Sequence, residues 1–283
     1  TRVFKQLPNA LITGIDYPAS PYVDNFDLVP EQAFTKAQMG LTGLDRYDFV
    51  NGNDTGRIRS FINGGIARSG NRALTMDAWL YYQPGVNDSL TATFNLSGYN
   101  ANTDEIRLDF WYKNHRQINV STNRVWIRGD DTRDWLEVYN LYANQNPATA
   151  SYKFTGSIEI SDFLRNATPS AQNFSSSFQV RWGTFAQMMT SDNFSGAGYT
   201  FDDIRIYKVT DDMAMLSIDT PYVNNCGLNA TTPIRVAVRN TRSTDVNTVP
   251  VRYRVNGGAW ITENVPLIPA DDTVQYTFST TAD

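Results

Sequence analysis

Short segments in which apolar and polar residues alternate recur along the whole chain, and they constrain its fold more than any other feature. In 106–113 (IRLDFWYK) and 177–185 (SFQVRWGTF), apolar residues stand at every second position. Successive strand side chains point to opposite faces, so this period predicts half-buried strands. Uninterrupted helical spacing is rare, and only 160–167 (ISDFLRNA), with Ser161 as its N-cap, predicts a short helix. The predicted fold class is therefore all-β.

The strand pattern breaks at 208–216, where a polar connector follows the strand 198–207. Beyond the break, further strands are predicted, and Asn256-Gly257 between alternating segments is a strong hairpin signal. The second part is too short for a complete sandwich. We therefore predict three segments: a lead-in at 1–23, a large β-sandwich at 24–209 and a smaller, incomplete one at 216–283.

Charge and composition exclude several classes of partner. The formal net charge is −5, and no run of Lys or Arg is present, so we expect neither nucleic-acid binding nor a polybasic membrane anchor. No stretch approaches the roughly 18 apolar residues of a membrane span, so we expect no membrane insertion. Cys226 is the only cysteine, which excludes an internal disulfide. The chain starts at Thr1, and we expect a monomeric fragment of a larger exported protein.

The segment 198–207 (GYTFDDIRIY) opens with two adjacent carboxylates. Strict alternation places Asp202 on the same face as Ile204 and Ile206, pointing towards the core. A buried carboxylate is costly unless it is neutralised, hydrogen-bonded or bound to a metal. Two interpretations follow: Asp202 caps a turn or pairs with an arginine, or it ligates a hard cation.

Three segments, DNFD (24–27), ARSGNRALTM (67–76) and GYTFDDIRIY, together resemble the MAM-like, concanavalin-type jelly rolls of bacterial surface and secreted proteins. The resemblance implies a jelly-roll sandwich whose first and last strands are neighbours. It also implies a structural cation, Ca²⁺ rather than Na⁺, held by Asp27, Asp202 and backbone carbonyls near 69–71. Animal MAM domains use paired cysteines, which this chain lacks. The tail, 216–283, is similar to the Ig-like, CARDB-like modules that follow such jelly rolls as spacers.

The segment 128–135 (RGDDTRDW) gathers charged and aromatic residues on one predicted loop. Loops on a rigid sandwich are common binding sites, which makes Arg128, Asp130, Asp131 and Trp135 candidate ligand-binding residues. The alternative is a solvated hairpin turn with local ion pairs.

A sugar-stacking platform is a further hypothesis for the aromatic side chains, although alternation places several of them in the core. The residues concerned are Trp79, Tyr81, Trp111, Trp126, Trp135 and Trp182.

Catalysis has little support. His115 is the only histidine and is expected in an exposed polar turn, while Glu105 and Asp109 stand four residues apart on one strand face. No HExxH or GxSxG motif is present. The sequence therefore predicts a protein that is not an enzyme.

The leading functional prediction is a non-catalytic adhesion or binding module of an exported, multidomain bacterial surface protein, with the Ig-like module as a spacer. We expect it outside the cell or at its surface, with an extracellular glycan or protein as ligand. Two alternatives remain: an accessory carbohydrate-binding module of a secreted hydrolase, and a structural spacer in a surface filament.

Overall fold

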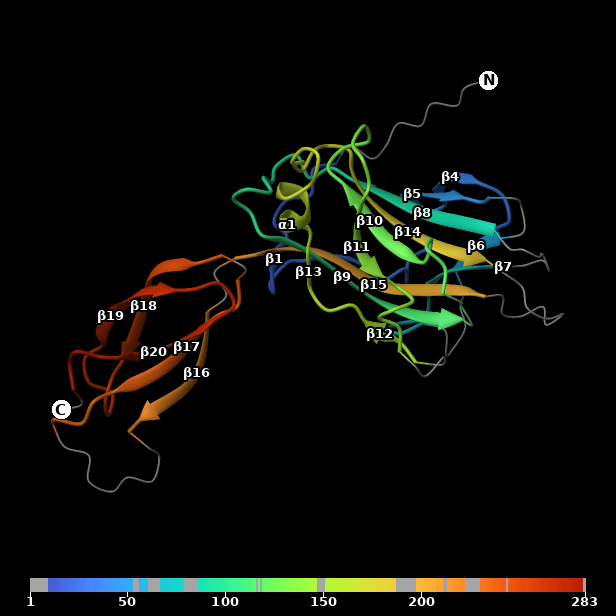
Figure 1. The fold of residues 1–283 in the computed structure, drawn as a ribbon. Coiled ribbons are helices and arrows are strands. Elements are labelled where there is room, and N and C mark those ends of the chain that lie inside the picture. The colour runs from blue at the N-terminus through green and yellow to red at the C-terminus, as the bar shows by residue number, and fades with distance from the viewer. Residues whose placement is uncertain are drawn as a thin grey trace. The chain divides into compact units, whose positions relative to one another are not determined.

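The computed structural model describes residues 10–52, 56–60, 67–78, 86–115, 117, 119–146, 151–186, 197–210, 213–221, 230–242 and 244–281. The chain forms two compact units, Thr1–Lys208 and Val209–Asp283. The strand β15 ends the first unit, and β16 begins the second (Figure 1). Among the described helices, none is long and apolar enough to cross a membrane.

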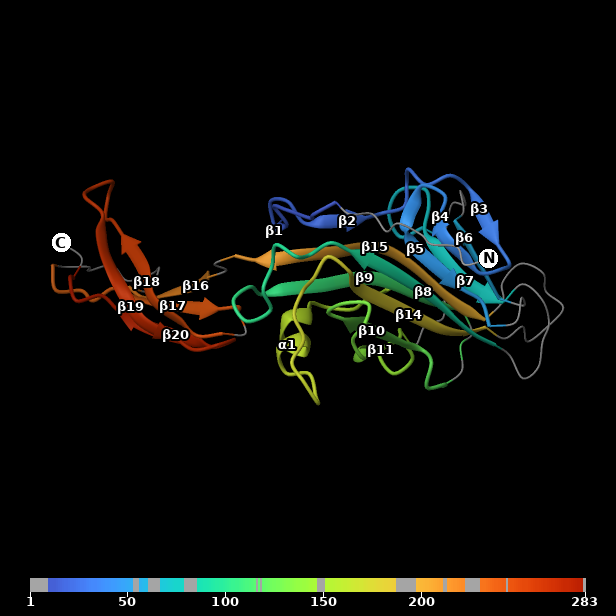
Figure 2. The same cartoon turned by 90° about the horizontal axis from the view of Figure 1, so that it is seen from above.

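The first unit is a sandwich of two sheets (Figure 2). One sheet has nine strands: β1 (Asp16–Tyr17), β2 (Tyr22–Asp24), β3 (Gln32–Phe34), β6 (Gly56–Ser60), β7 (Leu74–Ala78), β9 (Ile106–His115), β12 (Lys153–Phe154), β13 (Ile158–Glu159) and β15 (Gly198–Val209). The other has six, in the order β11 (Leu136–Asn140), β10 (Arg124–Arg128), β14 (Phe178–Ala186), β8 (Val86–Phe94), β5 (Leu44–Val50) and β4 (Gln38–Leu41). The predicted all-β jelly-roll sandwich is confirmed.

Aromatic side chains fill the space between these sheets. Trp182 of β14 is fully buried, with ring centroids 5.9 Å from Phe110 and 6.1 Å from Phe201 on the opposite sheet. Tyr47 of β5 stacks on the same tryptophan at 6.3 Å. Large buried rings contribute more apolar area than any other side chain, so this cluster anchors the two layers to each other.

The predicted helix is present as α1 (Ile160–Arg165), but its predicted cap is wrong. Glu159 occupies the N-cap position and makes no capping hydrogen bond through its side chain. Ser161 lies inside the helix, where its hydroxyl donates to the carbonyl of Asp104 at 2.7 Å and accepts from the N–H of Ile106. The Ser161 hydroxyl, which the sequence pattern assigned to helix capping, therefore makes tertiary hydrogen bonds instead.

Residues 10–23, expected as part of a lead-in, belong to the sandwich. The N–H of Lys208 donates to the carbonyl of Ile15, and β2 pairs with β15 through Asp24 opposite Ile204. The first and last strands of this unit are therefore neighbours, as the family resemblance implied.

The alternation predicted for β15 is interrupted by a β-bulge between Asp202 and Arg205. Asp203 adopts a positive φ of 48°, so one extra residue enters the strand. Phe201 and Ile204 consequently both face the core, and Asp202 lies opposite Trp111 on the outer face. The predicted sharing of a face by Asp202 and Ile204 is therefore wrong.

The second unit has a core of its own, formed by Ile234, Val236, Val238, Val249, Val251, Val265, Ile268 and Phe278. Its strands are β16 (Met213–Thr220), β17 (Arg235–Asn240) and β20 (Thr273–Thr277) in one sheet, and β18 (Val246–Tyr253) and β19 (Ile261–Ile268) in another. Asn256 and Gly257, with φ of 48° and 78°, lie in the turn between β18 and β19, as predicted. The strand β16 starts three residues before the expected beginning of this module at 216.

Candidate functional site

The outer face of the six-stranded sheet carries a candidate site. Because Trp182 of β14 points into the core, its neighbours Arg181 and Gly183 point outward. On the adjacent strand β10, buried Val125 and Ile127 likewise leave Trp126 on the outer face. Core packing thus brings a tryptophan, an arginine and a glycine together on rigid strands.

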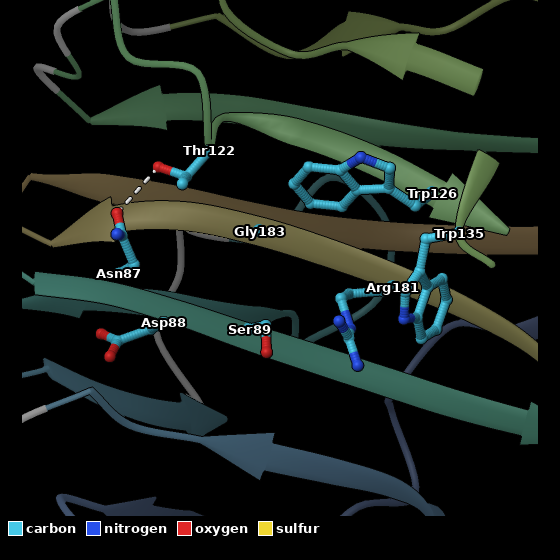
Figure 3. Close-up of a pocket in the computed structure, with 8 residues that line it drawn as sticks. All are labelled: Asn87, Asp88, Ser89, Thr122, Trp126, Trp135, Arg181 and Gly183. Carbon is cyan, nitrogen blue, oxygen red and sulfur yellow. Dashed lines mark hydrogen bonds between the residues drawn. The ribbon is translucent and has the colours of Figure 1, made fainter. Parts of the chain in front are cut away.

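These residues border a hollow of about 280 Å³ (Figure 3). Its lining residues are Asn87, Asp88, Ser89, Thr122, Trp126, Trp135, Arg181 and Gly183. The lining combines two indole rings with a few polar groups, a mixture typical of small-ligand sites.

Gly183 allows the ring of Trp126 to lie close over the sheet. A Cβ atom at Gly183 would come within 2.7 Å of the Trp126 ring and 2.5 Å of the Thr122 carbonyl oxygen. Any larger residue would push the ring off the backbone. At one end of the hollow, the hydroxyl of Thr122 donates to Asn87 Oδ1 at 2.9 Å, the contact drawn in Figure 3.

Trp135 forms the other end, held by two arginines. The guanidinium carbons of Arg181 and Arg128 lie 3.9 Å and 4.4 Å from its ring centroid. Such cation–π contacts fix the orientation of the ring. Of the four predicted ligand-binding residues, Trp135 lines the hollow and Arg128 contacts its ring without lining the hollow.

Asp130 and Asp131 lie in the turn between β10 and β11 and do not line the hollow. Asp130 accepts hydrogen bonds from the N–H and hydroxyl of Thr132 at 2.8 Å and 2.5 Å, and it pairs with Arg133 at 3.6 Å. Asp131 accepts from the hydroxyl of Ser177 at 3.1 Å. These contacts match the hairpin-turn alternative. Their ligand-binding role stays a prediction.

Sequence reasoning did not select Arg181, Gly183, Asn87, Ser89 or Thr122. The outward direction of Arg181 could be read from its place beside Trp182 in the alternating segment. Its approach to Trp135 depends on the pairing of β10 with both β14 and β11, which the local sequence pattern does not encode.

The tryptophans divide between core and surface. Trp182 is buried in the core, whereas Trp111, Trp126 and Trp135 are partly exposed. Trp79, Tyr81 and Cys226 lie outside the described residues.

The acidic residues weighed for catalysis are each paired with an arginine. Arg107 Nε donates to Glu105 at 2.7 Å, and Arg205 donates two hydrogen bonds to Asp109, both 2.7 Å long. Each of these carboxylates is therefore held by a charge-assisted hydrogen bond.

His115 is the last residue of β9 and is partly buried, so its predicted position in an exposed turn is wrong. Its Nε2 lies 2.7 Å from the hydroxyl oxygen of Thr200, which itself hydrogen-bonds with Thr75 at 2.8 Å.

The two predicted metal ligands both hold the segment 68–72. Buried Asp202 accepts the N–H groups of Arg68 and Ser69 at 2.8 Å and 3.1 Å, and Asp27 accepts that of Asn71 at 2.7 Å. The sequence thus correctly brought both carboxylates to this loop. Asp203 adds an ion pair with Arg68 at 2.9 Å.

These hydrogen bonds match the turn-capping interpretation of Asp202. The groups aimed at Asp202 and Asp27 are N–H donors, whose partial positive charge repels a cation, whereas a calcium shell needs oxygen atoms. Among the described residues, no cluster of three acidic, histidine or cysteine side chains could hold a metal ion. The residues as placed do not fit a calcium site, and calcium binding stays a prediction.

A second buried carboxylate, Asp88, lies at the end of β8. It is 3% exposed, accepts the N–H of Gly52 at 3.0 Å through Oδ1, and has no hydrogen-bond partner on Oδ2 among the described residues. Burial raises its pKa to about 7. Burial also raises the pKa of Asp202, to about 6, although its backbone N–H partners oppose the shift.

A comparison with protein-family models finds no match, and a comparison with curated proteins finds none either. The expected likeness to MAM-like and CARDB-like families therefore stays a prediction.

Several solved structures are similar to parts of this chain. The xylan-binding domain CBM22-1 of Xyn10C from Paenibacillus barcinonensis matches at 9% identity and a TM-score of 0.32, over 68% of this chain and 95% of that domain. TmCBM61, solved with β-1,4-galactotriose, matches at 10% and 0.33, over 57% and 88%. A β-1,2-glucanase from Parabacteroides distasonis matches at 14% and 0.37, over 82% of this chain but 32% of the enzyme.

Substituting Gly70 tests how tightly Asp27 holds the loop. Gly70 has a φ of 57°, and a Cβ there would lie 1.9 Å from Asp27 Oδ2. Gly156, with a φ of 75° and no atom within 4 Å of such a Cβ, is the matched control. We expect Gly156→Ala to cost about 1 kcal/mol from backbone strain. Gly70→Ala should cost roughly 3 kcal/mol in urea unfolding, because it also displaces the carboxylate. Equal losses of unfolding free energy in the two variants would contradict the conclusion that Asp27 holds this loop.

Melting the protein in EDTA and then in excess Ca²⁺ tests the calcium prediction. An ion that binds only the folded state should stabilise it by about 3 kcal/mol at a hundredfold excess over its dissociation constant. A calcium-dependent rise in melting temperature that disappears in Asp202→Asn would support a cation. Unchanged melting would leave hydrogen bonding to the loop as the whole role of the two carboxylates.

The raised pKa values of Asp88 and Asp202 predict a pH-dependent stability. Both lie above the ordinary value of 3.8, so protonation favours the folded state, and this stabilisation is lost as pH rises through 6 and 7. The melting temperature should therefore fall between pH 5 and pH 8. Asp88→Asn should flatten the fall, whereas Asp134→Asn, at an exposed site, should leave it unchanged. If Asp88→Asn leaves the fall of melting temperature with pH unaltered, the role given to Asp88 in this pH dependence would be contradicted.

Proposed function

We propose that this chain is a non-catalytic carbohydrate-binding module whose sugar site is the hollow on the outer face of the six-stranded sheet. The observation that carries the proposal is the flat, partly exposed ring of Trp126, seated over Gly183 and bordered by polar groups. A pyranose ring offers a C–H face that packs on an indole and hydroxyls that need donors and acceptors at its rim. Ser89, Arg181 and the Asn87–Thr122 pair supply those groups.

The size of the hollow also favours a small, sugar-sized ligand. Its volume of about 280 Å³ lies near the lower end of small-molecule sites, roughly 300 to 1,000 Å³. A stable protein partner would instead need about 800 Å² of surface on each side. Protein-directed adhesion through the loop 128–135 has less support, because Asp130 is hydrogen-bonded within the turn and Asp131 is hydrogen-bonded to Ser177.

The lack of a catalytic role is part of the same proposal. Glu105 and Asp109 are bound to arginines, and His115 lies at the end of a strand of the other sheet, away from the lining of the hollow. A module that captures glycans acts where glycans are exposed, so an extracellular or cell-surface location, with the second unit as spacer, belongs to the proposal.

Removing the Trp126 ring should weaken glycan binding. After a glycan array has identified ligands, Trp126→Ala should lose about 2 kcal/mol of binding energy, roughly thirtyfold in Kd by calorimetry. Trp260→Ala is the matched control, because Trp260 is 48% exposed, carries two arginines near its ring and lies in the second unit.

The same titrations should leave the glycan uncleaved when the products are separated by chromatography. Undiminished binding by Trp126→Ala, or an equal loss in Trp260→Ala, would place the sugar site elsewhere. Cleavage that disappears in His115→Ala or Glu105→Gln would overturn the non-catalytic assignment.

A further inference from the structure

Two arginines on neighbouring strands converge beside the hollow. Arg181 of β14 and Arg128 of β10 both approach the ring of Trp135. Their Nε atoms are held by neutral partners: Arg128 Nε donates to Gln179 at 2.6 Å, and Arg181 Nε donates to Thr91 at 3.2 Å. The two guanidinium groups are therefore positioned without help from a carboxylate.

Most other described arginines of this unit have an acidic partner. Arg124, on the same face, pairs with Glu137 at 3.0 Å, and Arg57 and Arg205 pair with buried aspartates on the other sheet at 2.7 Å. Neither Arg128 nor Arg181 forms an ion pair with any described residue. The outer face consequently carries two positive charges close together, neither of them in an ion pair with a described residue.

Placing two cations this close is unfavourable without an anion. Burial, followed by repulsion from Arg128, lowers the pKa of Arg181. Burial also lowers the pKa of Arg128, which the nearby charges of Asp131 and Asp130 only partly offset. Like charges beside a small hollow are relieved when a ligand brings negative charge to them.

Arg181 is placed to receive that charge. It lines the hollow together with Trp126, whereas Arg128 contacts the ring of Trp135 without lining the hollow. The Nε of Arg181 is committed to Thr91. Its two terminal NH₂ groups are not buried without a hydrogen-bond partner. A guanidinium presents its donors as a planar fork that matches the two oxygens of a carboxylate.

We propose that the glycan bound in this hollow is acidic, with a uronic-acid carboxylate received by Arg181 while a sugar ring packs on Trp126. This inference rests on the proposed carbohydrate-binding function and specifies its ligand class. The carboxylate neutralises Arg181 and Arg128, and the aromatic ring supplies contact for the uncharged face of the sugar.

Matched pairs of oligosaccharides test the proposal with the full chain. Uronate oligomers are compared with the same oligomers after reduction of each carboxylate to a primary alcohol, and sulfated oligosaccharides form a third arm. We expect uronates to bind more tightly than their reduced forms, with a preference that shrinks as salt rises, because ions screen the contact.

Substitutions at Arg181 identify the receiving group. Arg181→Gln should weaken uronate binding about tenfold more than it weakens binding of the reduced oligomers, and Arg181→Lys should retain part of the preference, since it keeps the charge but loses the fork. Arg124→Gln, at an arginine already paired on the same face, should have no effect. Thermal melting establishes that each variant is folded.

Three results would overturn the proposal. Equal affinity for uronates and reduced oligomers, weakened by Trp126→Ala but not by Arg181→Gln, would reject the acidic ligand and leave the carbohydrate function standing. Tighter binding of sulfated oligomers would reject the carboxylate. Binding of no glycan in any arm would reject the proposed function itself.

Discussion

The burial of Trp182 between the two sheets is the contact on which the rest of the first unit depends. It fixes which face of β14 is interior, and strand geometry then places Arg181 and Gly183 on the outside. The neighbouring strand follows through its own buried residues and brings Trp126 over Gly183. The candidate sugar site therefore lies on the outer side of the sheet whose inner side packs on the aromatic core, which gives its tryptophan a rigid support.

On the opposite sheet, the bulge at Asp203 sets which side chains of β15 face the core. By adding one residue to β15, it keeps both Phe201 and Ile204 in the core and turns Asp202 outward. Asp202 is nevertheless fully buried, because segment 68–72 covers it and donates two backbone N–H groups. Asp27 holds the other end of that segment. Carboxylates separated widely in sequence thus close one loop over the sheet.

Much of the architecture could be predicted from alternation. The segments 106–113 and 177–185 became β9 and β14. The candidate site was only partly predicted. Trp135 was selected for its place in a charged loop, but its partner Arg181 lies in another strand, and their contact arises from sheet pairing. The calcium hypothesis assumed carbonyl oxygens around Asp202, where the fold presents N–H groups.

The sequence by itself determined that this chain is built from strands, because side-chain alternation and turn residues act locally and are visible in any short window. It also determined which rings would be buried wherever alternation is regular. Only the tertiary structure decided the face of Asp202, because a single bulged residue reverses every later side chain at little local cost. It alone placed Arg128, Arg181 and Trp135 together, because their proximity comes from the order and register of strands, which long-range packing selects.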